Sequence, residues 1–398
     1  MHETYDPEIQ ALGAPAVRPV RLGIIGGGQL AKMTALAALP LGCEVVVLER
    51  NPFSPAARLC PGSLVGDWND PATLLEFAAR VDVLTLENEF VNSEALATVE
   101  RAGHPVYPTS ATMALTQDKL TQKQALQDAG LPVPAFRAVG SPADVLDAAR
   151  DMGWPLLLKA RRNGYDGKGN FTLRSELELA TAWKKLGGGT SSLLVEVFCR
   201  FSKELAVMVT RGRDGGTAIY PVVETVQRDH VCHLVKAPAD LPEAIAERAR
   251  ELARRAVTAV DGIGTFGVEM FLGEDGALAI NELAPRVHNS GHYTVEACVC
   301  SQFENHVRAV LGWPLGGTEM VAPAAVMFNL LGGEKAPGRP LGWENALRVP
   351  GAHVHLYGKA MSGPGRKMGH VTAVGNSVAT AVATAERAAR EIRFIPQA

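Results

Sequence analysis

Apolar runs alternate with amphipathic segments along the first part of the chain. Apolar residues predict strands over 20–25, 43–48 and 81–86. Between them, the spacing of apolar positions predicts helices over about 29–39 and 71–79. Strand–helix–strand order at this spacing is typical of a parallel, doubly wound sheet, so we predict an α/β fold for this region.

The same alternation continues through the rest of the chain, where apolar runs become more often separated by glycine and proline. Residues 241–260 carry opposite charges at helical spacing and predict a long amphipathic helix. The other predicted helices are 118–129, 142–152, 176–186 and 378–392. The predicted strands are 155–160, 171–173, 193–197, 205–209, 324–330, 353–356 and 370–374.

Residues 266–292 contain two apolar runs that each carry one acidic residue, Glu269 and Glu282. The segment Gly273-Glu274-Asp275-Gly276 between them predicts a hairpin turn. With the turn centred on Glu274 and Asp275, Glu269 is expected opposite Ile280 and diagonal to Glu282. Diagonal neighbours lie roughly 7–8 Å apart, close enough for two carboxylates to share metal ions.

A functional role for this acidic pair is favoured over a structural one. Both acids lie in apolar runs that we expect to be buried, and a buried unpaired carboxylate is costly. Arg286, His288 and Asn289 follow closely, with glycines around them. Oxygen ligands that hold Mg²⁺ beside donors that hold an anion are what nucleotide-phosphate chemistry requires.

Composition limits the classes of protein that need to be considered. The 398 residues are enough for two or three domains, and 47% hydrophobic residues are typical of a sizeable core. A net charge of −3 gives no reason to expect a nucleic-acid partner or an anionic membrane. No apolar run is long enough to span a bilayer, and the first residues lack the features of a secretory signal. The six cysteines form no Cys-x-x-Cys pair, which predicts reduced thiols and a cytoplasmic location.

The first glycine-rich segment, Gly26-Gly27-Gly28-Gln29-Leu30-Ala31, follows a predicted strand and begins a predicted helix. It fits the dinucleotide pattern G-x-G-x-x-G/A, and Glu49 stands where a ribose-binding acid is expected. Alone, this segment favours an NAD enzyme. Because any glycine turn at a helix N-terminus presents free amides, binding of another phosphate remains an alternative.

Three further groups suggest contacts to a nucleotide or another anion. The segment 163–170 is a glycine-rich loop after the strand that bears Lys159, and its amides and Lys168 are candidates to hold a phosphate chain. Glu196 and Glu204 are candidates to contact adenine and ribose. Lys359, Arg366 and Lys367 lie in a glycine-rich hairpin and form a candidate anion clamp.

Taken together, these residues resemble the ATP-grasp superfamily, and within it the N5-carboxyaminoimidazole ribonucleotide synthetase family. The resemblance covers the chain from about Arg21 to the closing helix. It rests on the glycine turn, on Gly164-Tyr165-Asp166-Gly167-Lys168-Gly169, on the run from Asn281 to His292, and on Arg366-Lys367-Met368-Gly369-His370.

The resemblance implies an ATP-dependent carbon–nitrogen ligase. ATP would phosphorylate bicarbonate to carboxyphosphate, and the amine of 5-aminoimidazole ribonucleotide would capture the carboxyl group, giving N5-carboxyaminoimidazole ribonucleotide, ADP and phosphate. The implied partners are these small molecules alone, without nucleic acid or membrane, and the implied assembly is a homodimer. The implied domains are a flexible extension (1–19), a parallel-sheet domain (20–117), an ATP-grasp domain (118–315, lid about 155–210) and a β-rich C-terminal domain with a closing helix (316–398).

The resemblance also assigns roles to residues. Mg²⁺ would be held by Glu269 and Glu282. Catalytic contacts to bicarbonate are expected from Arg286, His288, Asn289 and Lys359. The ribonucleotide is expected to contact Gln29, Leu30, Tyr165, Asp166, Arg366 and Lys367. The residues expected to bind ATP are Lys119, Lys159, Gly164, Asp166, Gly167, Lys168, Gly169, Asn170, Glu196, Val197, Phe198, Cys199, Glu204 and Asn281.

The chain departs from the family pattern at several positions. Lys119 stands where an arginine is common, Asn170 where a glutamine is usual, and Gln227 where a histidine is common. The segment around Glu87 varies a Thr-x-Glu-x-Glu-Asn motif and leaves the role of Glu87 open. Three alternatives also remain open: a related formate- or biotin-linked ATP-grasp enzyme, an NAD-dependent dehydrogenase, and a nucleotide-sensing module without turnover.

Overall fold

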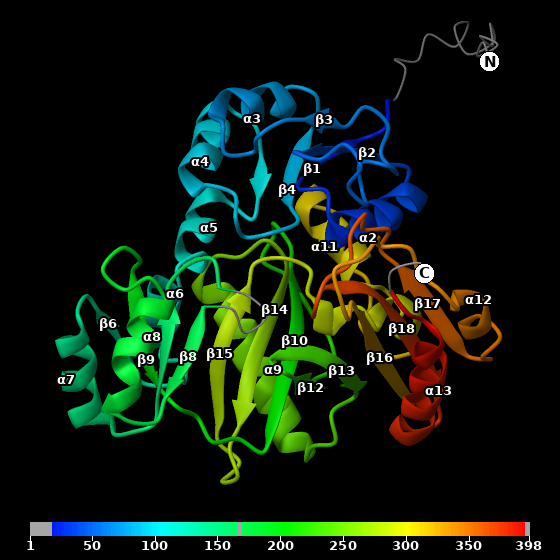
Figure 1. Cartoon of the computed structure of the whole chain (residues 1–398). Helices are drawn as coiled ribbons and strands as arrows, with labels where there is room; N and C mark the ends of the chain where they lie inside the picture. Colours follow the sequence, from blue (N-terminus) through cyan, green and yellow to red (C-terminus); the bar gives the residue numbers. More distant parts are fainter. Residues whose placement is uncertain (1–17, 165–168, 395–398) are drawn as a thin grey trace, which may run out of the picture.

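A computed structural model of the chain describes residues 18–164 and 169–394, which form three sheets with helices packed against them (Figure 1). The first sheet has five parallel strands in the order β3-β2-β1-β4-β5, which confirms the predicted parallel α/β region. Its strands are β1 (Arg21–Ile25), β2 (Glu44–Glu49), β3 (Leu64–Val65), β4 (Val83–Leu86) and β5 (Val106–Tyr107). Its helices are α2 (Gln29–Ala38), the 3₁₀ turn η1 (Leu39–Leu41), α3 (Pro71–Ala78), α4 (Ser93–Arg101) and α5 (Ser110–Thr116).

The second sheet is small and antiparallel, and it projects to one side of the molecule at the left of Figure 1. Its strand order is β6-β9-β7-β8, and α7 and α8 pack on it through an aliphatic core. Its strands are β6 (Phe136–Val139), β7 (Leu156–Ala160), β8 (Asn170–Leu173) and β9 (Leu193–Val197). Its helices are α7 (Pro142–Met152), η2 (Glu176–Glu178) and α8 (Leu179–Lys185). We refer to this unit as the lid.

The third sheet is the largest and runs through the middle of the molecule into the C-terminal region. Its order is β15-β14-β10-β12-β13-β16-β18-β17, with β11 paired to β10. The strands of the chain's last part therefore continue the central sheet, through the β13–β16 pair. The strands are β10 (Lys203–Arg211), β11 (Thr217–Ile219), β12 (Val223–Arg228), β13 (Val231–Ala237), β14 (Gly264–Leu272), β15 (Leu278–Ala284), β16 (Ala324–Leu331), β17 (Ala352–Leu356) and β18 (Lys367–Gly375).

Amphipathic helices cover the large sheet. The predicted long helix forms as α9 (Glu243–Ala259) and buries Ala249, Leu252 and Ala256 against β14 and β15, because positions three and four apart share one helix face. The remaining helical segments are α6 (Lys119–Asp128), η3 (Asn289–Gly291), α10 (Thr294–Ala297), α11 (Gln302–Leu311), α12 (Trp343–Ala346) and α13 (Val378–Glu391). Among the described residues, no helix combines the length and apolar character needed to cross a membrane.

Strands β12 and β13 were not among the predicted elements. They are mixed in character, and most of their residues are only partly buried, so neither has a clear alternating pattern. The turn between them lacks glycine, although Asp229 and His230 both have positive φ angles of 51° and 63°. Turn residues of this conformation are usually glycine or asparagine, so the sequence signal of a hairpin is weak here.

The glycine turn after β1 is packed tightly against carboxylate side chains. Gly26 has a φ of 97°, and a Cβ atom there would lie 2.4 Å from Cγ of Glu87. A Cβ at Gly28 would lie 2.3 Å from Oε1 of the same residue. Glycine is therefore required here by the close approach of Glu87, in addition to the backbone conformation at Gly26.

We predict that Gly26→Ala destabilises the protein by about 3 kcal/mol, because it combines a left-handed backbone with this clash. Gly42→Ala is the matched control: Gly42 has a φ of 76°, but nothing lies within 4 Å of its Cβ position. That change should cost only about 1 kcal/mol. Chemical denaturation measures both, and equal losses would contradict the packing argument.

Candidate active site

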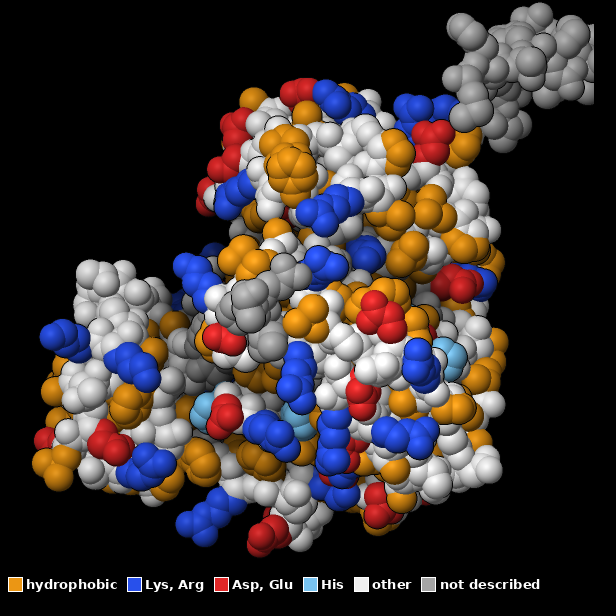
Figure 2. Space-filling view, turned by 45° about the vertical axis from the view of Figure 1, so that its right-hand side comes forward, with side chains coloured by type: hydrophobic (Ala, Val, Ile, Leu, Met, Phe, Trp, Pro, Cys, Tyr) orange, Lys and Arg blue, Asp and Glu red, His pale blue; other side chains and the backbone are white. Residues whose placement is uncertain are grey.

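One cavity of about 1,710 Å³ lies where the N-terminal sheet, the lid and the large sheet meet. Figure 2 shows several Lys and Arg side chains near the middle of the face in view. Every described residue that the family resemblance assigned to the site lines this cavity except Gly169. Tyr165, Asp166, Gly167 and Lys168 lie outside the described residues. The nominated lining residues are Gln29, Leu30, Lys119, Lys159, Gly164, Asn170, Glu196, Val197, Phe198, Cys199, Glu204, Glu269, Asn281, Glu282, Arg286, His288, Asn289, Lys359, Arg366 and Lys367.

The two acidic residues of the β14–β15 hairpin lie directly opposite each other, instead of diagonally as expected. Glu269 pairs directly with Glu282, and Ile280 pairs with Met270, so the predicted pairing of Glu269 with Ile280 was wrong. Two one-residue shifts cause the difference: Gly273 pairs with Ala277, so the turn is centred on Asp275, and a bulge at Asn281 places one extra residue in β15. The bulge also breaks the alternation, so that Asn281 and Glu282 both line the cavity although they are consecutive.

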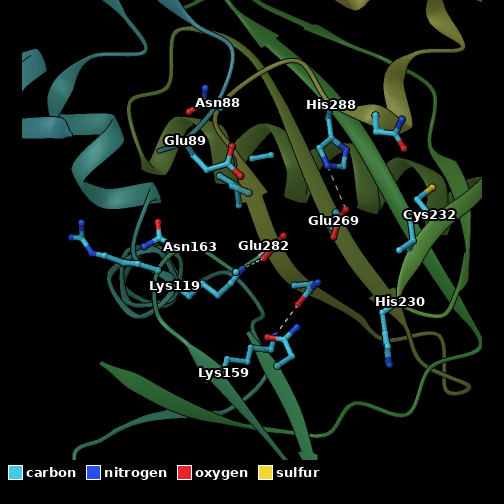
Figure 3. A pocket seen from close by; sticks show the side chains of 18 of the residues that line it. Asn88, Glu89, Lys119, Lys159, Asn163, His230, Cys232, Glu269, Glu282 and His288 are labelled. Carbon is cyan, nitrogen blue, oxygen red and sulfur yellow. Dashed lines mark hydrogen bonds and ion pairs between the residues drawn. The ribbon is translucent and has the colours of Figure 1, made fainter. Parts of the chain in front are cut away.

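Direct cross-strand neighbours have Cβ atoms roughly 4.5–5.5 Å apart, so the two carboxylates strongly affect each other. Burial and the charge of Glu282 raise the pKa of Glu269 to about 7. Burial alone would raise the pKa of Glu282 as well, but the adjacent Lys119 ammonium lowers it to about 2. Figure 3 shows Lys119 pointing at Glu282, and His288 on the other side with its Nε2 3.6 Å from Oε1 of Glu269.

This donor set suits a hard divalent cation. Two carboxylates and the side-chain oxygen of Asn281 line one wall of the cavity, and oxygen atoms of this kind are the ligands that Mg²⁺ prefers. A cation here would also relieve the repulsion that raises the pKa of Glu269. The residues therefore fit the magnesium site expected from the sequence.

The end of the cavity that is expected to hold the nucleotide, which we call the nucleotide end, contains a buried cluster of charges. The carboxylate of Glu196 lies 2.8 Å from Nζ of Lys159 and 3.2 Å from Nζ of Lys123. Burial would raise the pKa of Glu196, but the two lysines lower it overall. Because both lysines contact its carboxylate, the charge of Glu196 is neutralised within the protein. The adjacent Val197 ends β9, and Phe198 and Cys199 begin the connection from the lid to β10.

Glu204 lies on β10 on the same side of the cavity. Burial raises its pKa, and a hydrogen bond from Gln227 opposes that rise. Gln227, at the position where the family commonly has histidine, thus contacts the expected ribose-binding carboxylate.

Lys119 is held in place by the residue before it. Asp118 caps α6 by accepting from the Leu120 amide at 3.0 Å, and it accepts two hydrogen bonds from Arg161 of the lid at 2.9 and 2.7 Å. The Lys119 amide also donates to the Arg161 carbonyl at 2.8 Å. These contacts join the lid to the start of α6 beside the Lys119–Glu282 ion pair.

The residues after Glu282 line the end of the cavity that is expected to hold an anion, which we call the anion end. Arg286 donates from Nε and Nη2 to both oxygens of Glu89, at 2.5 and 3.0 Å, and Glu89 comes from the loop after β4. This pairing occupies the Nε–Nη2 edge of the guanidinium, and Nη1 donates to the Val287 carbonyl at 3.3 Å, so that only part of the donor set remains for another acceptor. Lys359 comes from the C-terminal region and lies over the ring of Tyr357, 5.7 Å from the centroid.

His288 is fixed through its backbone and its ring. Gln302 accepts from the His288 amide at 2.9 Å and donates to its carbonyl at 2.7 Å, while Nδ1 lies 2.8 Å from Oγ of Ser290. Burial, followed by the charges of Arg286 and Lys367, lowers the pKa of His288 to about 3. The imidazole is therefore neutral at physiological pH and can act as a hydrogen-bonding group without adding charge.

Gln29 and Leu30, which follow the glycine turn, line a third side of the cavity. The amides of the turn are partly occupied by the protein itself: Gly27 donates to Glu49 at 2.7 Å and Ala31 donates to Glu87 at 3.0 Å. The carboxylate of Glu49, the acid expected to bind a dinucleotide ribose, is therefore engaged by the Gly27 amide of the glycine turn. This arrangement counts against the dinucleotide interpretation of the segment.

Comparison with known proteins agrees with this geometry. Residues 20–117 match the ribonucleotide synthetase preATP-grasp domain, 124–303 the ATP-grasp domain, and 325–384 the phosphoribosylaminoimidazole carboxylase C-terminal domain. The chain is 43% identical over 363 residues to N5-carboxyaminoimidazole ribonucleotide synthase of Synechococcus elongatus, covering 91% of each protein. The chain belongs to the N5-carboxyaminoimidazole ribonucleotide synthase family.

Two further relatives show how far the similarity reaches. Phosphoribosylaminoimidazole carboxylase of Ogataea methanolica is 43% identical over 365 residues, which cover 90% of this chain and 67% of that protein. A crystal structure of N5-carboxyaminoimidazole synthase from Aspergillus clavatus, in complex with ADP and 5-aminoimidazole ribonucleotide, aligns with a TM-score of 0.85 at 36% identity. The alignment covers 93% of this chain and 98% of the Aspergillus clavatus chain. The fold expected from the sequence, an ATP-grasp enzyme with an N-terminal parallel sheet and a β-rich C-terminal part, is confirmed.

Among the charged residues at or beside the cavity that were not nominated from the sequence are Lys123 and Glu89. Lys123 lies one helical turn after Lys119, a spacing that places both on one face of α6 and was an available signal. Glu89 follows β4 two residues after Glu87, at the carboxyl end of a parallel strand, where ligand sites commonly lie. Their partners, Glu196 and Arg286, are far away in the sequence, so neither contact has a local signal.

We predict that Lys123→Met destabilises the folded protein by about 2 kcal/mol, because it leaves the buried Glu196 carboxylate with Lys159 alone. Burial already lowers the pKa of Lys123 to about 8, so this lysine depends on its carboxylate partner. Lys184→Met, at an exposed position of α8, is the control and should change stability by less than about 0.5 kcal/mol. Urea titration compares the two, and similar small effects would contradict the assigned ion pair.

Proposed function

We propose that this chain catalyses the ATP-dependent carboxylation of 5-aminoimidazole ribonucleotide by bicarbonate, giving N5-carboxyaminoimidazole ribonucleotide, ADP and phosphate, a step of purine biosynthesis. The observation that carries the proposal is the single cavity in which the Glu269–Glu282 pair lies between a lysine-rich nucleotide end and the Arg286–His288–Asn289 segment. Support comes from the Aspergillus clavatus relative, which holds ADP and 5-aminoimidazole ribonucleotide in its structure.

In the first step, an oxygen of bicarbonate attacks the γ-phosphorus of ATP, and the bond to the β–γ bridging oxygen breaks. Lys159 and Lys119, with the glycine-rich loop 163–170, orient the phosphates, while Glu204 and the hinge at Val197 contact ribose and adenine. Glu269, Glu282 and Asn281 would hold Mg²⁺, which supplies charge neutralisation at the transferring phosphoryl group when bound.

Carboxyphosphate, the product of the first step, must be kept from water because it hydrolyses readily. Arg286 would contact it through the N–H groups that Glu89 and the Val287 carbonyl do not engage, and Asn289 offers an amide N–H. The neutral His288 hydrogen-bonds without adding positive charge to the Lys359 and Arg286 cations. Donors preorganised in this way stabilise the charge that develops on the oxygens.

In the second step, the amine of the ribonucleotide attacks the carboxyl carbon, phosphate leaves, and the amine loses a proton. Arg366 and Lys367 would hold the ribonucleotide phosphate together with the glycine turn at Gln29 and Leu30. Tyr165 and Asp166 would position the ring and its amine. Since Gln29, Leu30, Arg366 and Lys367 line the same cavity as the residues that would hold carboxyphosphate, the unstable group would be transferred without leaving the protein.

The decisive assay measures ADP release with ATP and Mg²⁺, adding 5-aminoimidazole ribonucleotide and bicarbonate separately and together. We expect full turnover only when both are present. Stimulation by formate in place of bicarbonate would favour a formate-linked relative, and ATP binding without turnover would favour a sensing module. Quenching of nicotinamide fluorescence would favour the dehydrogenase.

We predict that Glu282→Gln abolishes turnover and leaves the fold intact, because it removes a metal-binding charge from the cavity wall. Glu274→Gln, in the turn of the same hairpin, is the control and should retain activity. ADP release and circular dichroism measure the two properties. Retained activity in Glu282→Gln would refute the metal assignment.

We predict that Lys359→Met spares ATP binding but loses carboxylation, since Lys359 belongs to the anion end of the cavity. The affinity for ATP, measured by calorimetry, should stay within about 2-fold, because the nucleotide end is unchanged. A large loss of ATP affinity would instead place Lys359 at the nucleotide.

We also propose that the chain forms a homodimer and acts in the cytoplasm. The family resemblance supports the first, and the absence of disulfides among the described cysteines is consistent with the second. Sedimentation velocity that shows only a monomer at micromolar concentration would refute the homodimer.

A further inference from the structure

The side chain of Asn329 contacts the cavity only through another residue. Asn329 lies in β16 and is 2% exposed. Its amide forms a reciprocal pair with Asn289: Nδ2 of Asn289 donates to Oδ1 of Asn329 at 2.9 Å, and Nδ2 of Asn329 donates to Oδ1 of Asn289 at 2.8 Å. Asn289 lines the cavity, whereas Asn329 does not.

An isolated amide pair has no preferred sense, because turning both amides over leaves the same two hydrogen bonds. A third contact removes this ambiguity here. Nδ2 of Asn329 also donates to the carbonyl of Cys232 at 2.9 Å. A carbonyl oxygen can only accept, so the nitrogen of Asn329 must face it, and an oxygen in that place would be repelled.

The orientation of Asn329 in turn sets that of Asn289. Oδ1 of Asn289 must face the nitrogen of Asn329, and its own nitrogen must face Oδ1 of Asn329. One N–H of Asn289 then has no hydrogen-bond partner among the residues that the structure describes. Asn289 is therefore locked with a donor available to the cavity and with its acceptor engaged.

We propose that Asn329 is a positioning residue for carboxylation, which makes Asn289 present an N–H to bicarbonate and carboxyphosphate. The inference rests on the proposed function. An oxyanion needs a donor, and the Asn289 oxygen would repel it, so the sense of the amide decides whether this residue helps or hinders binding. The Cys232 carbonyl, which can only accept, fixes the orientation of the Asn329 amide, and Asn329 in turn fixes the orientation of the Asn289 amide at the anion site.

The test is Asn329→Leu, which removes the amide at similar volume. Losing an oriented hydrogen bond to an anion should raise the KM for bicarbonate about 10-fold. The KM for ATP should stay within about 2-fold, because the nucleotide end is untouched. Asn329→Ser serves as the second variant if the leucine variant does not fold, and an ADP-induced rise in Tm confirms the fold of each.

A double-mutant cycle separates positioning from general stability. In an Asn289→Ala background, Asn329→Leu should change the KM for bicarbonate by less than about 2-fold, because the amide that Asn329 orients is no longer present. If it raises that KM as strongly as in the wild type, or if the KM for bicarbonate is unchanged in both Asn329 variants, the inference is wrong. Wild-type protein that shows no bicarbonate-dependent turnover overturns the proposed function and this inference together.

Asn305 provides the matched control. It is also fully buried and donates from Nδ2 to the hydroxyl of Tyr220 at 2.8 Å, away from the cavity lining. Asn305→Leu should lower Tm without changing the KM for bicarbonate. If Asn305→Leu and Asn329→Leu raise that KM equally, the effect is one of stability and the positioning role is refuted.

Discussion

The structure of the site depends on two carboxylates that the β14–β15 hairpin forces together. Glu269 and Glu282 are direct cross-strand neighbours, and burial together with the charge of Glu282 raises the pKa of Glu269 to about 7. Two lysines offset the negative charge of Glu282: Lys119 from α6 and Lys159 from the lid. Two neighbouring carboxylates also suit a divalent cation.

The large sheet makes this pair the centre of a single site. Strands β13 and β16 hydrogen-bond to each other, so the C-terminal strands belong to the same sheet as the hairpin, with β10, β12 and β13 between them. Lys359 and Asn329 therefore reach the anion end from residues that follow the ATP-grasp region in the chain. The Arg286–Glu89 contact ties the N-terminal domain to the same end. Three parts of the chain are thereby joined around one cavity, each through a polar contact.

Many polar groups of the site form hydrogen bonds or ion pairs with other groups of the protein. Glu49 and Glu87 occupy amides of the glycine turn, Glu196 pairs with two lysines, and Glu89 covers one edge of Arg286. Each contact removes some donors from the cavity and leaves others in a defined direction. Selectivity for an anion then depends on which donors remain, as the Asn289–Asn329 pair illustrates.

The sequence alone determined the features whose signals are local. Periodicity located α7 and α9, and the apolar runs around Glu269 and Glu282 located the acidic hairpin. Only the tertiary structure decided the bulge at Asn281, the partners of Glu196 and Arg286, and the sense of the Asn289 amide. The physical reason is that periodicity reports which face of an element is buried, whereas a hydrogen-bond or ion-pair partner depends on which distant segment packs against that face.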